Sequence, residues 1–324
     1  MKKINWPIVI VLMIVIAASI YWNPLSRSKI SHTGKKTSEN TIAMSGAWAL
    51  YPMAVRWAEE YQKIHPEVRF DVTAGGAGKG MTDALSGAVD IGKVSREIYP
   101  DEIKKGAFPI AVVKDAVIPM MNENNPVAST ILKRGIKQNE FKAIWIAGTL
   151  KDWGKLTGTK TKAPINIYTR SDSCGAAATW AEYLGKKQED LKGIGIYGDP
   201  GLAQAVKKDT NGIGFNNLNY AYDAKTKLPV KGLKVIPIDI NGNGKIDRSE
   251  YFYGTRDELQ NAIADGRYPS PPAKNLYFVT KGHPKGHVKA FIQWVLTDGQ
   301  KYVPETGYIC LPKQKLMQGL QKIK

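Results

Sequence analysis

Apolar and polar positions along the chain follow two periods, one typical of strands and one typical of helices. Residues 68–72 (VRFDV) and 165–169 (INIYT) place apolar or β-branched side chains at every second position, which predicts strands. Residues 51–65 (YPMAVRWAEEYQKIH) and 287–296 (HVKAFIQWVL) place apolar side chains at helical spacing. Because short strands and helices alternate along the chain, the pattern predicts an α/β fold.

Residues 255–266 carry the signals of both ends of a helix. Thr255 and Glu258 form a capping box, and Gly266 is the residue type that favours the left-handed conformation after a last turn. The same spacing predicts further helices over 81–89, 175–185 and 201–209.

The N-terminus is basic and then continuously apolar. Lys2 and Lys3 precede an apolar run over 6–22, which is typical of a secretory signal or a signal anchor. We expect an uncleaved anchor over 1–23 and a polar linker over 24–40, with the remaining chain outside the membrane. Cleavage after the small residues 17–19 is the alternative, and it would leave a secreted or periplasmic protein.

Composition and charge narrow the class of protein. The chain has 324 residues, 43% of them hydrophobic and 23% charged, which fits about two globular domains and excludes wholesale disorder. The net charge of +17 is compatible with anionic partners. No basic stripe is interleaved with stacking aromatic residues, and the chain is expected outside the cytoplasm, so we expect no nucleic-acid partner.

Three polar loops lie at predicted strand-to-helix junctions, over residues 45–51, 74–80 and 169–175. Helix N-termini present unpaired N–H groups and the positive end of the helix dipole, so three such loops could enclose a small oxyanion. An ordinary helix cap is the alternative for each loop. The AGGAGKG stretch is no P-loop, because Lys79 is followed by Gly80 and not by a magnesium-binding Ser or Thr.

The order of several segments resembles the phosphate-binding substrate-binding proteins of phosphate ABC transporters. The resemblance covers most of residues 41–315, and it rests on five segments: SGAWALYPMAVRWAEEYQ, TAGGAGKGMTDALSGAVDIGKVSRE, GIKQNEFKAIWIAGTLKDWGKL, TRSDSCGAAATWAEYLG and NLYFVTKGHPKGHVKAFIQWVLTDGQKYVPETGYICLP. It implies the two-lobed periplasmic binding protein-like fold (type II), with crossing hinge strands and a ligand in the cleft, and binding without catalysis. We assign lobe 1 to 41–118 plus 255–324 and lobe 2 to 119–254.

The resemblance also implies a set of ligand-binding residues, although several hydroxyl groups of the family are missing. Ala77 stands where the family usually has a serine, and Cys174 where it has another. Arg96 follows Ser95 at a position that is often an aspartate in the family. The expected ligand-binding set is Ser45, Leu50, Tyr51, Gly76, Ala77, Gly78, Ser95, Arg96, Arg170, Ser173, Cys174 and Gly175.

The choice of anion depends on whether the cleft contains an acceptor. Phosphate at neutral pH keeps a proton that a carboxylate can accept, whereas sulfate or molybdate needs donors only. Arg96 would shift selectivity or tighten phosphate binding by charge, or it would be a structural salt-bridge partner. Asp172 is an alternative acceptor. Phosphate is the preferred ligand.

Residues 239–250 match a 12-residue EF-hand loop. Oxygen donors occupy positions 1, 3, 5, 9 and 12, and a glycine occupies position 6, which is the arrangement that calcium prefers. A plain Asx- and Gly-rich turn is the alternative. The predicted structural calcium ligands are Asp239, Asn241, Asn243, Lys245 (through its carbonyl), Asp247 and Glu250.

The sequence therefore predicts an extracytoplasmic, membrane-tethered binding protein that delivers phosphate, or a similar oxyanion, to an ABC permease. A phosphate sensor of the same fold is the main alternative, and a calcium-stabilised adhesion protein is another. An enzyme such as a secreted phosphatase ranks last, because no Ser/His/Asp or Cys/His arrangement is present. Cys174 and Cys310 are expected to be free thiols, with a disulfide as the alternative.

Overall fold

The computed structural model describes residues 40–324, so the predicted anchor over 1–23 and nearly all of the linker lie outside the described residues. Within the described residues, nine strands form one mixed sheet in the order β2-β1-β3-β9-β4-β7-β5-β6, with β8 paired to β4. The strands are β1 (Thr41–Gly46), β2 (Arg69–Val72), β3 (Ile91–Val94), β4 (Ala107–Asn122), β5 (Asn166–Arg170), β6 (Ile194–Ile196), β7 (Gly212–Asn217), β8 (Leu233–Val235) and β9 (Ala273–Lys281).

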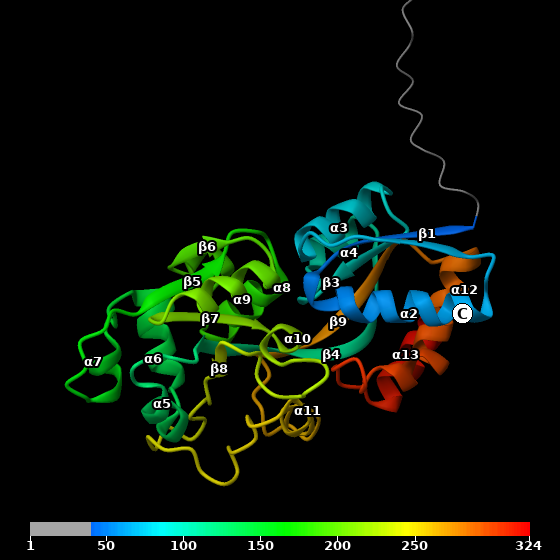
Figure 1. Ribbon diagram of the computed structural model, residues 1–324. Helices are drawn as coiled ribbons and strands as arrows, with labels where there is room; N and C mark the ends of the chain where they lie inside the picture. Colours follow the sequence, from blue (N-terminus) through cyan, green and yellow to red (C-terminus); the bar gives the residue numbers. More distant parts are fainter. Residues whose placement is uncertain (1–39) are drawn as a thin grey trace, which may run out of the picture. The chain divides into compact units, whose positions relative to one another are not determined.

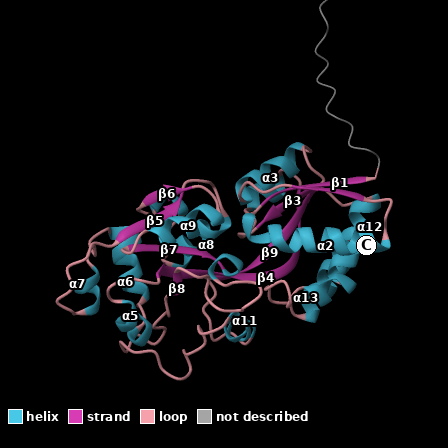
Figure 2. Ribbon diagram, viewed as in Figure 1, coloured by secondary structure: helices cyan, strands magenta, loops and turns pink. Residues whose placement is uncertain are grey.

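Helices cover the sheet in two groups (Figures 1 and 2). The first group contains η1 (Trp48–Leu50), α2 (Tyr51–Ile64), α3 (Ala77–Ser86), α4 (Pro100–Lys104), α12 (Gly286–Leu296), η4 (Asp298–Tyr302) and α13 (Lys313–Lys322). The second contains α5 (Ala128–Arg134), α6 (Gln138–Lys142), η2 (Ala143–Ala147), α7 (Trp153–Thr157), α8 (Gly175–Tyr183), η3 (Gln188–Asp190), α9 (Asp199–Lys208), α10 (Leu218–Ala221) and α11 (Arg256–Ala264). No helix of residues 40–324 is long and apolar enough to cross a bilayer.

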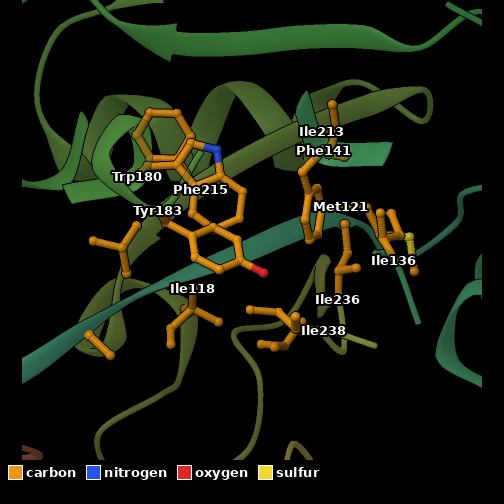
Figure 3. Packing of buried hydrophobic residues seen from close by; sticks show 14 of the residues in the cluster. Ile118, Met121, Ile136, Phe141, Trp180, Tyr183, Ile213, Phe215, Ile236 and Ile238 are labelled. Carbon is orange, nitrogen blue, oxygen red and sulfur yellow. The ribbon is translucent and has the colours of Figure 1, made fainter. Parts of the chain in front are cut away.

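Two large hydrophobic cores define two lobes. Trp57 and Phe291 lie in the first core, and Trp180 and Phe215 stack in the second, with ring centroids 5.8 Å apart (Figure 3). Each core is assembled around one half of the sheet, so the predicted two-lobed α/β fold is confirmed.

The long strands β4 and β9 belong to both lobes. In β4, Val113 packs in the first core and Ala116 in the second. In β9, Ala273 packs in the second core and Leu276 in the first. The chain therefore crosses between the lobes in the middle of these two antiparallel strands, which are paired along most of their length. Figure 1 shows both strands running from one lobe into the other.

The helix α11 packs in the second lobe, whereas the sequence analysis assigned it to lobe 1. Its Leu259 and Ile263 pack in the second core, so the return to the first lobe occurs in β9 and not at residue 255. Sequence patterning shows that α11 is amphipathic, but it does not show which core the apolar face meets.

The predicted local elements are largely present. The strands β2 and β5 and the helices α2 and α12 fall where the apolar spacing predicts them. The capping box of α11 is formed, with Thr255 Oγ1 accepting from the Glu258 N–H at 3.2 Å and the Thr255 N–H donating to Glu258 at 2.8 Å. The helix α3 begins at Ala77, four residues earlier than expected, so part of the glycine-rich loop is helical.

Candidate functional site

The predicted polar loops of the two lobes meet directly. The Gly78 N–H at the start of α3 donates to the Ser173 carbonyl before α8, at 3.2 Å. A Cβ atom on Gly175 would lie 2.0 Å from the Ser95 carbonyl oxygen, so only glycine permits this approach. Ser95, which follows β3, and Gly78 of α3 in one lobe thus contact the start of α8 in the other, and the cleft between the lobes is closed here.

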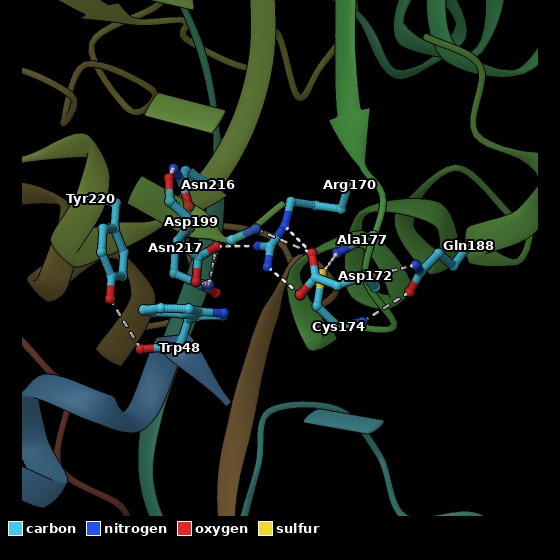
Figure 4. Close-up of polar contacts among 11 residues, drawn as sticks. Trp48, Arg170, Asp172, Cys174, Ala177, Gln188, Asp199, Asn216, Asn217 and Tyr220 are labelled. Carbon is cyan, nitrogen blue, oxygen red and sulfur yellow. Dashed lines mark hydrogen bonds and ion pairs between the residues drawn. The ribbon is translucent and has the colours of Figure 1, made fainter. Parts of the chain in front are cut away.

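A second contact between the lobes involves aromatic residues. The Tyr220 hydroxyl donates to the Trp48 carbonyl at 3.2 Å, and the Trp48 ring meets Tyr197 edge to face at 6.2 Å. Trp48 belongs to η1 in the first lobe, and its two partners belong to the second. Figure 4 shows Trp48 and Tyr220 beside the polar cluster described next.

Arg170 is the centre of the polar cluster in the cleft. It lies at the end of β5, and its side chain is almost fully buried. Its Nε and Nη2 atoms donate to the two oxygens of Asp172 at 2.8 and 2.6 Å, and Nη1 donates to Asp199 at 2.5 Å (Figure 4). These bonds use three of the five guanidinium N–H groups.

The carboxylates set the charge state of this cluster. Burial opposes the charge of Arg170, but Asp199 and Asp172 outweigh burial and hold its pKa above the ordinary value. Burial raises the pKa of Asp199, and Arg170 opposes that shift. Asn217 Nδ2 lies 3.0 Å from each oxygen of Asp199. The guanidinium is therefore fixed in position and permanently charged.

Asp199 and Asn217 are site residues that the sequence analysis missed. Asp199 is the first residue of α9, and an acidic residue is common in the first turn of any helix. It pairs with Arg170, which lies 29 positions earlier in the sequence. Only the packing of α9 beside β5 brings the two together.

The start of α8 is held by Cys174 and Gln188. The Cys174 Sγ atom accepts from the Ala177 N–H at 3.4 Å, and the Cys174 N–H donates to Gln188 Oε1 at 3.2 Å. Burial raises the pKa of Cys174 to about 12, so it is a neutral helix cap. The thiols of Cys174 and Cys310 are both free.

Several predicted site residues already have partners inside one lobe. Ser45 Oγ donates to Asp83 of α3 at 2.6 Å. Arg96 binds both oxygens of Glu102, at 2.6 and 3.0 Å, and its guanidinium lies 4.2 Å from the Tyr99 ring centroid. Arg96 thus makes the structural salt bridge that the sequence analysis left as its alternative role.

The remaining predicted residues lie at the helix starts. The Leu50 N–H donates to the carbonyl of Ala47, the residue before η1, and Tyr51 begins α2. A Cβ atom on Gly78 would lie 2.7 Å from Ser173 Oγ, which places Ser173 at the start of α3. The residues concerned are Leu50, Tyr51, Gly76, Ala77, Gly78, Ser95, Ser173 and Gly175.

A cavity of about 770 Å³ opens beside this contact. Arg96, Glu97 and Tyr99 line it from the first lobe, and Ser173 and Cys174 are among its lining residues from the second. The cavity connects the surface with the loop that follows Arg170.

Buried charged residues also lie on the strands below the cleft. Asp115 of β4 and Lys274 of β9 are opposite each other in register. Burial raises the pKa of Asp115 to about 7 and lowers that of Lys274 to about 8, although each charge opposes the shift of the other. On β3, Lys93 is fully buried, and its Nζ lies 4.7 Å from the Tyr51 ring centroid.

The EF-hand-like loop, residues 239–250, is folded back on itself by hydrogen bonds between its own carboxylates and its own backbone N–H groups. Asp239 accepts from the N–H groups of Gly242 and Gly244, both at 2.8 Å, and Glu250 accepts from three backbone N–H groups of the loop. In residues 40–324, no group of three or more His, Cys, Asp or Glu side chains is arranged to hold a metal ion. Calcium binding by this loop stays a prediction.

Two α/β lobes joined by crossing strands, with helix starts and a buried arginine between them, define a two-lobed ligand-binding protein. The family model described as "PBP superfamily domain" matches residues 31–299, and the chain belongs to this superfamily.

Sequence and structure comparisons agree with this assignment. The chain is 27% identical over 291 residues to the phosphate-binding protein PstS of Bacillus subtilis (strain 168), covering 88% of this chain and 86% of that protein. It is 26% identical over 306 residues to PstS of Pseudomonas aeruginosa, covering 87% and 86%. The fold resembles that of an ABC-type phosphate transport receptor from Vibrio cholerae, with a TM-score of 0.60 and 18% identity over 84% of this chain and all of the other. The resemblance to phosphate-binding proteins is confirmed.

Proposed function

We propose that this protein is an extracytoplasmic substrate-binding protein that captures phosphate between its lobes and delivers it to an ABC permease. The observation that carries the proposal is the buried guanidinium of Arg170, whose partner Asp172 lies against Gly76 at the start of α3 in the other lobe. Relatives described as phosphate-binding proteins support this choice of ligand. The placement outside the membrane rests on the basic and apolar N-terminal sequence.

The acceptors around Arg170 favour phosphate over fully deprotonated oxyanions. Asp172 and Asp199 are paired with Arg170, and carboxylate oxygens repel an anion that carries no proton. A phosphate that keeps a proton can donate it to such an oxygen, while the helix N–H groups and the guanidinium bind its other oxygens. We therefore propose that the activity of this site is binding without catalysis.

The loop 239–250 is proposed as a structural calcium site within the second lobe. Its support is the spacing of its oxygen-bearing residues and the burial of Asp239 and Glu250. It would stabilise the fold without contacting the phosphate ligand.

Calorimetric titration of the protein tests the proposed ligand. Phosphate should bind with micromolar or tighter affinity, and sulfate, molybdate and tungstate at least tenfold more weakly. If a fully deprotonated anion binds more tightly than phosphate, the assigned ligand is wrong. If none of the four binds below millimolar concentration, the transport function itself is wrong.

A further inference from the structure

Two buried ionisable side chains at the crossing between the lobes lack hydrogen-bond partners. Lys274 of β9 and Asp115 of β4 are opposite each other in register, and they are 6% and 1% exposed. Within residues 40–324, no hydrogen-bond partner reaches the Lys274 Nζ atom or either carboxylate oxygen of Asp115. Because an unbonded polar group is costly to bury, these atoms point to a partner that comes from outside the chain.

Both side chains lie between the lobes. Asp115 lies where β4 crosses from the first core to the second. Lys274 lines a cavity of about 410 Å³, whose walls include Glu97, which follows β3 in the first lobe, and Thr179 of α8 in the second. The pair therefore borders the interlobe space.

The same pair belongs to the polar cluster around Arg170. Burial lowers the pKa of Lys274 to about 8, while Asp115 and Asp199 oppose that shift and Arg170 adds to it. Burial likewise raises the pKa of Asp115, and the charge of Asp199 adds to the shift. The backbone N–H groups of Ala116 and Leu218 favour the ionised form of Asp115, although neither has the geometry of a hydrogen bond.

The first lobe adds another donor without an acceptor, the indole N–H of Trp48. Its Nε1 atom is buried, and no residue of the described chain accepts from it. A Cβ atom on Gly198, the residue before Asp199, would lie 3.4 Å from Cε2 of Trp48, the carbon bonded to that nitrogen. This donor therefore lies at the start of α9, next to a partner of Arg170 (Figure 4).

The carboxylates bonded to Arg170 are already used as acceptors. Both oxygens of Asp172 accept from the guanidinium. One oxygen of Asp199 accepts from Arg170, and Asn217 lies within hydrogen-bond distance of both. Asp115 is thus the carboxylate of this cluster whose oxygens remain available to a ligand.

We propose that Lys274 and Asp115 are specificity-determining residues at the floor of the cleft. The ammonium donates to an oxygen of the captured oxyanion, and the carboxylate accepts the proton that phosphate keeps and sulfate does not have. The inference rests on the proposed function and deepens it, because it names the groups that select a protonated oxyanion.

Titration of phosphate and of sulfate into the wild type, Lys274→Met, Asp115→Asn and the double variant tests the inference. Lys274→Met should weaken the binding of phosphate at least tenfold. Asp115→Asn removes a negative charge and supplies an N–H donor, so it should strengthen sulfate binding and lower the preference for phosphate over sulfate at least tenfold. Lys281→Met, an exposed lysine at the end of the same strand, is the matched control and should change either affinity less than twofold.

The double variant separates contact with the ligand from neutralisation within the pair. It replaces both buried charges with neutral side chains, so neither charge is left uncompensated in the folded protein. The double variant should bind phosphate at least tenfold more weakly than Asp115→Asn alone. Equal phosphate affinity in these two proteins would show that Lys274 only neutralises Asp115, and it would overturn the inference.

The remaining outcomes are also decisive. An unchanged preference for phosphate over sulfate in Asp115→Asn would overturn the acceptor role. If the wild type binds phosphate and all the variants bind it equally well, the inference fails while the proposed function stands. If the wild type binds neither anion, the proposed function fails and the inference fails with it.

Discussion

At the scale of single residues, Arg170 combines a structural role with the proposed binding role. Its guanidinium neutralises Asp199, which is buried and also bonded by Asn217. Such a group cannot be removed without leaving an uncompensated buried carboxylate. The loss of binding and the loss of stability are therefore expected together.

Arg170→Met should lower the free energy of unfolding by about 3–5 kcal/mol, because it leaves Asp199 buried without its counter-charge. Arg170→Lys keeps the positive charge but not the planar guanidinium with its several N–H donors. It should therefore lose less stability than Arg170→Met while still weakening phosphate binding. Urea denaturation and phosphate titration measure the two effects.

The matched control for this experiment is Arg267→Met, because Arg267 pairs with Asp265 in an exposed position. It should leave both stability and binding nearly unchanged. An Arg170→Met protein as stable as the control would contradict the assigned charge pairing.

At the scale of elements, β4 and β9 contain buried ionisable residues where they cross from one lobe to the other. Asp115 and Lys274 face each other there, and both are buried. Burial raises the pKa of Asp115 from 3.8 to about 7, although Lys274 opposes the shift. The folded protein therefore retains a proton that the unfolded chain releases between these pH values.

This difference in proton binding predicts a pH-dependent stability. Because the folded pKa lies above the unfolded value, the contribution of protonated Asp115 is complete below about pH 4 and is lost as pH rises to about 7. The free energy of unfolding should fall over this window relative to Asp115→Asn, which has no proton to lose. Urea denaturation of both proteins at a series of pH values measures the difference, and parallel curves would contradict the assignment.

The loop 239–250 is the element whose metal dependence is most easily tested. At a calcium concentration one hundred times the dissociation constant, binding to the folded state alone adds about 2.7 kcal/mol to stability. Millimolar calcium should therefore raise the melting temperature by several degrees, and a chelator should reverse the rise.

Glu250→Gln is the control for calcium, because it removes the bidentate carboxylate while keeping its size. This variant should melt at the same temperature with calcium and with chelator. A wild-type melting temperature that does not respond to either addition would exclude the calcium site.

At the scale of the whole molecule, sequence patterning predicts the helices and strands better than it predicts which side chains they bury or bring together. The strand β5, the capping box of α11 and the loop carrying Arg170 all follow from local residue order. Lys93 lies in β3 (Ile91–Val94), and nothing in the local residue order shows that its side chain is buried. The partnership of Arg170 with Asp199 arises only when β5 and α9 pack together.

Closure of the two lobes is also a property of the whole chain, and Tyr220 offers a way to perturb it. Its hydroxyl donates a hydrogen bond to the Trp48 carbonyl across the cleft. A hydrogen bond of this kind contributes about 0.5–1.5 kcal/mol, so Tyr220→Phe should weaken phosphate binding by roughly two- to tenfold.

The weakening in Tyr220→Phe should appear in the rate of phosphate release, because the lost bond stabilises the closed state after capture. Stopped-flow measurement of tryptophan fluorescence can follow this rate, since the Trp48 ring contacts Tyr197 across the cleft. Tyr251→Phe, an exposed tyrosine of the second lobe, is the matched control and should release phosphate at the wild-type rate. Faster release in Tyr220→Phe with an unchanged association rate would assign the Trp48–Tyr220 contact to closure, whereas slower association with unchanged release would place its effect before capture and contradict that role.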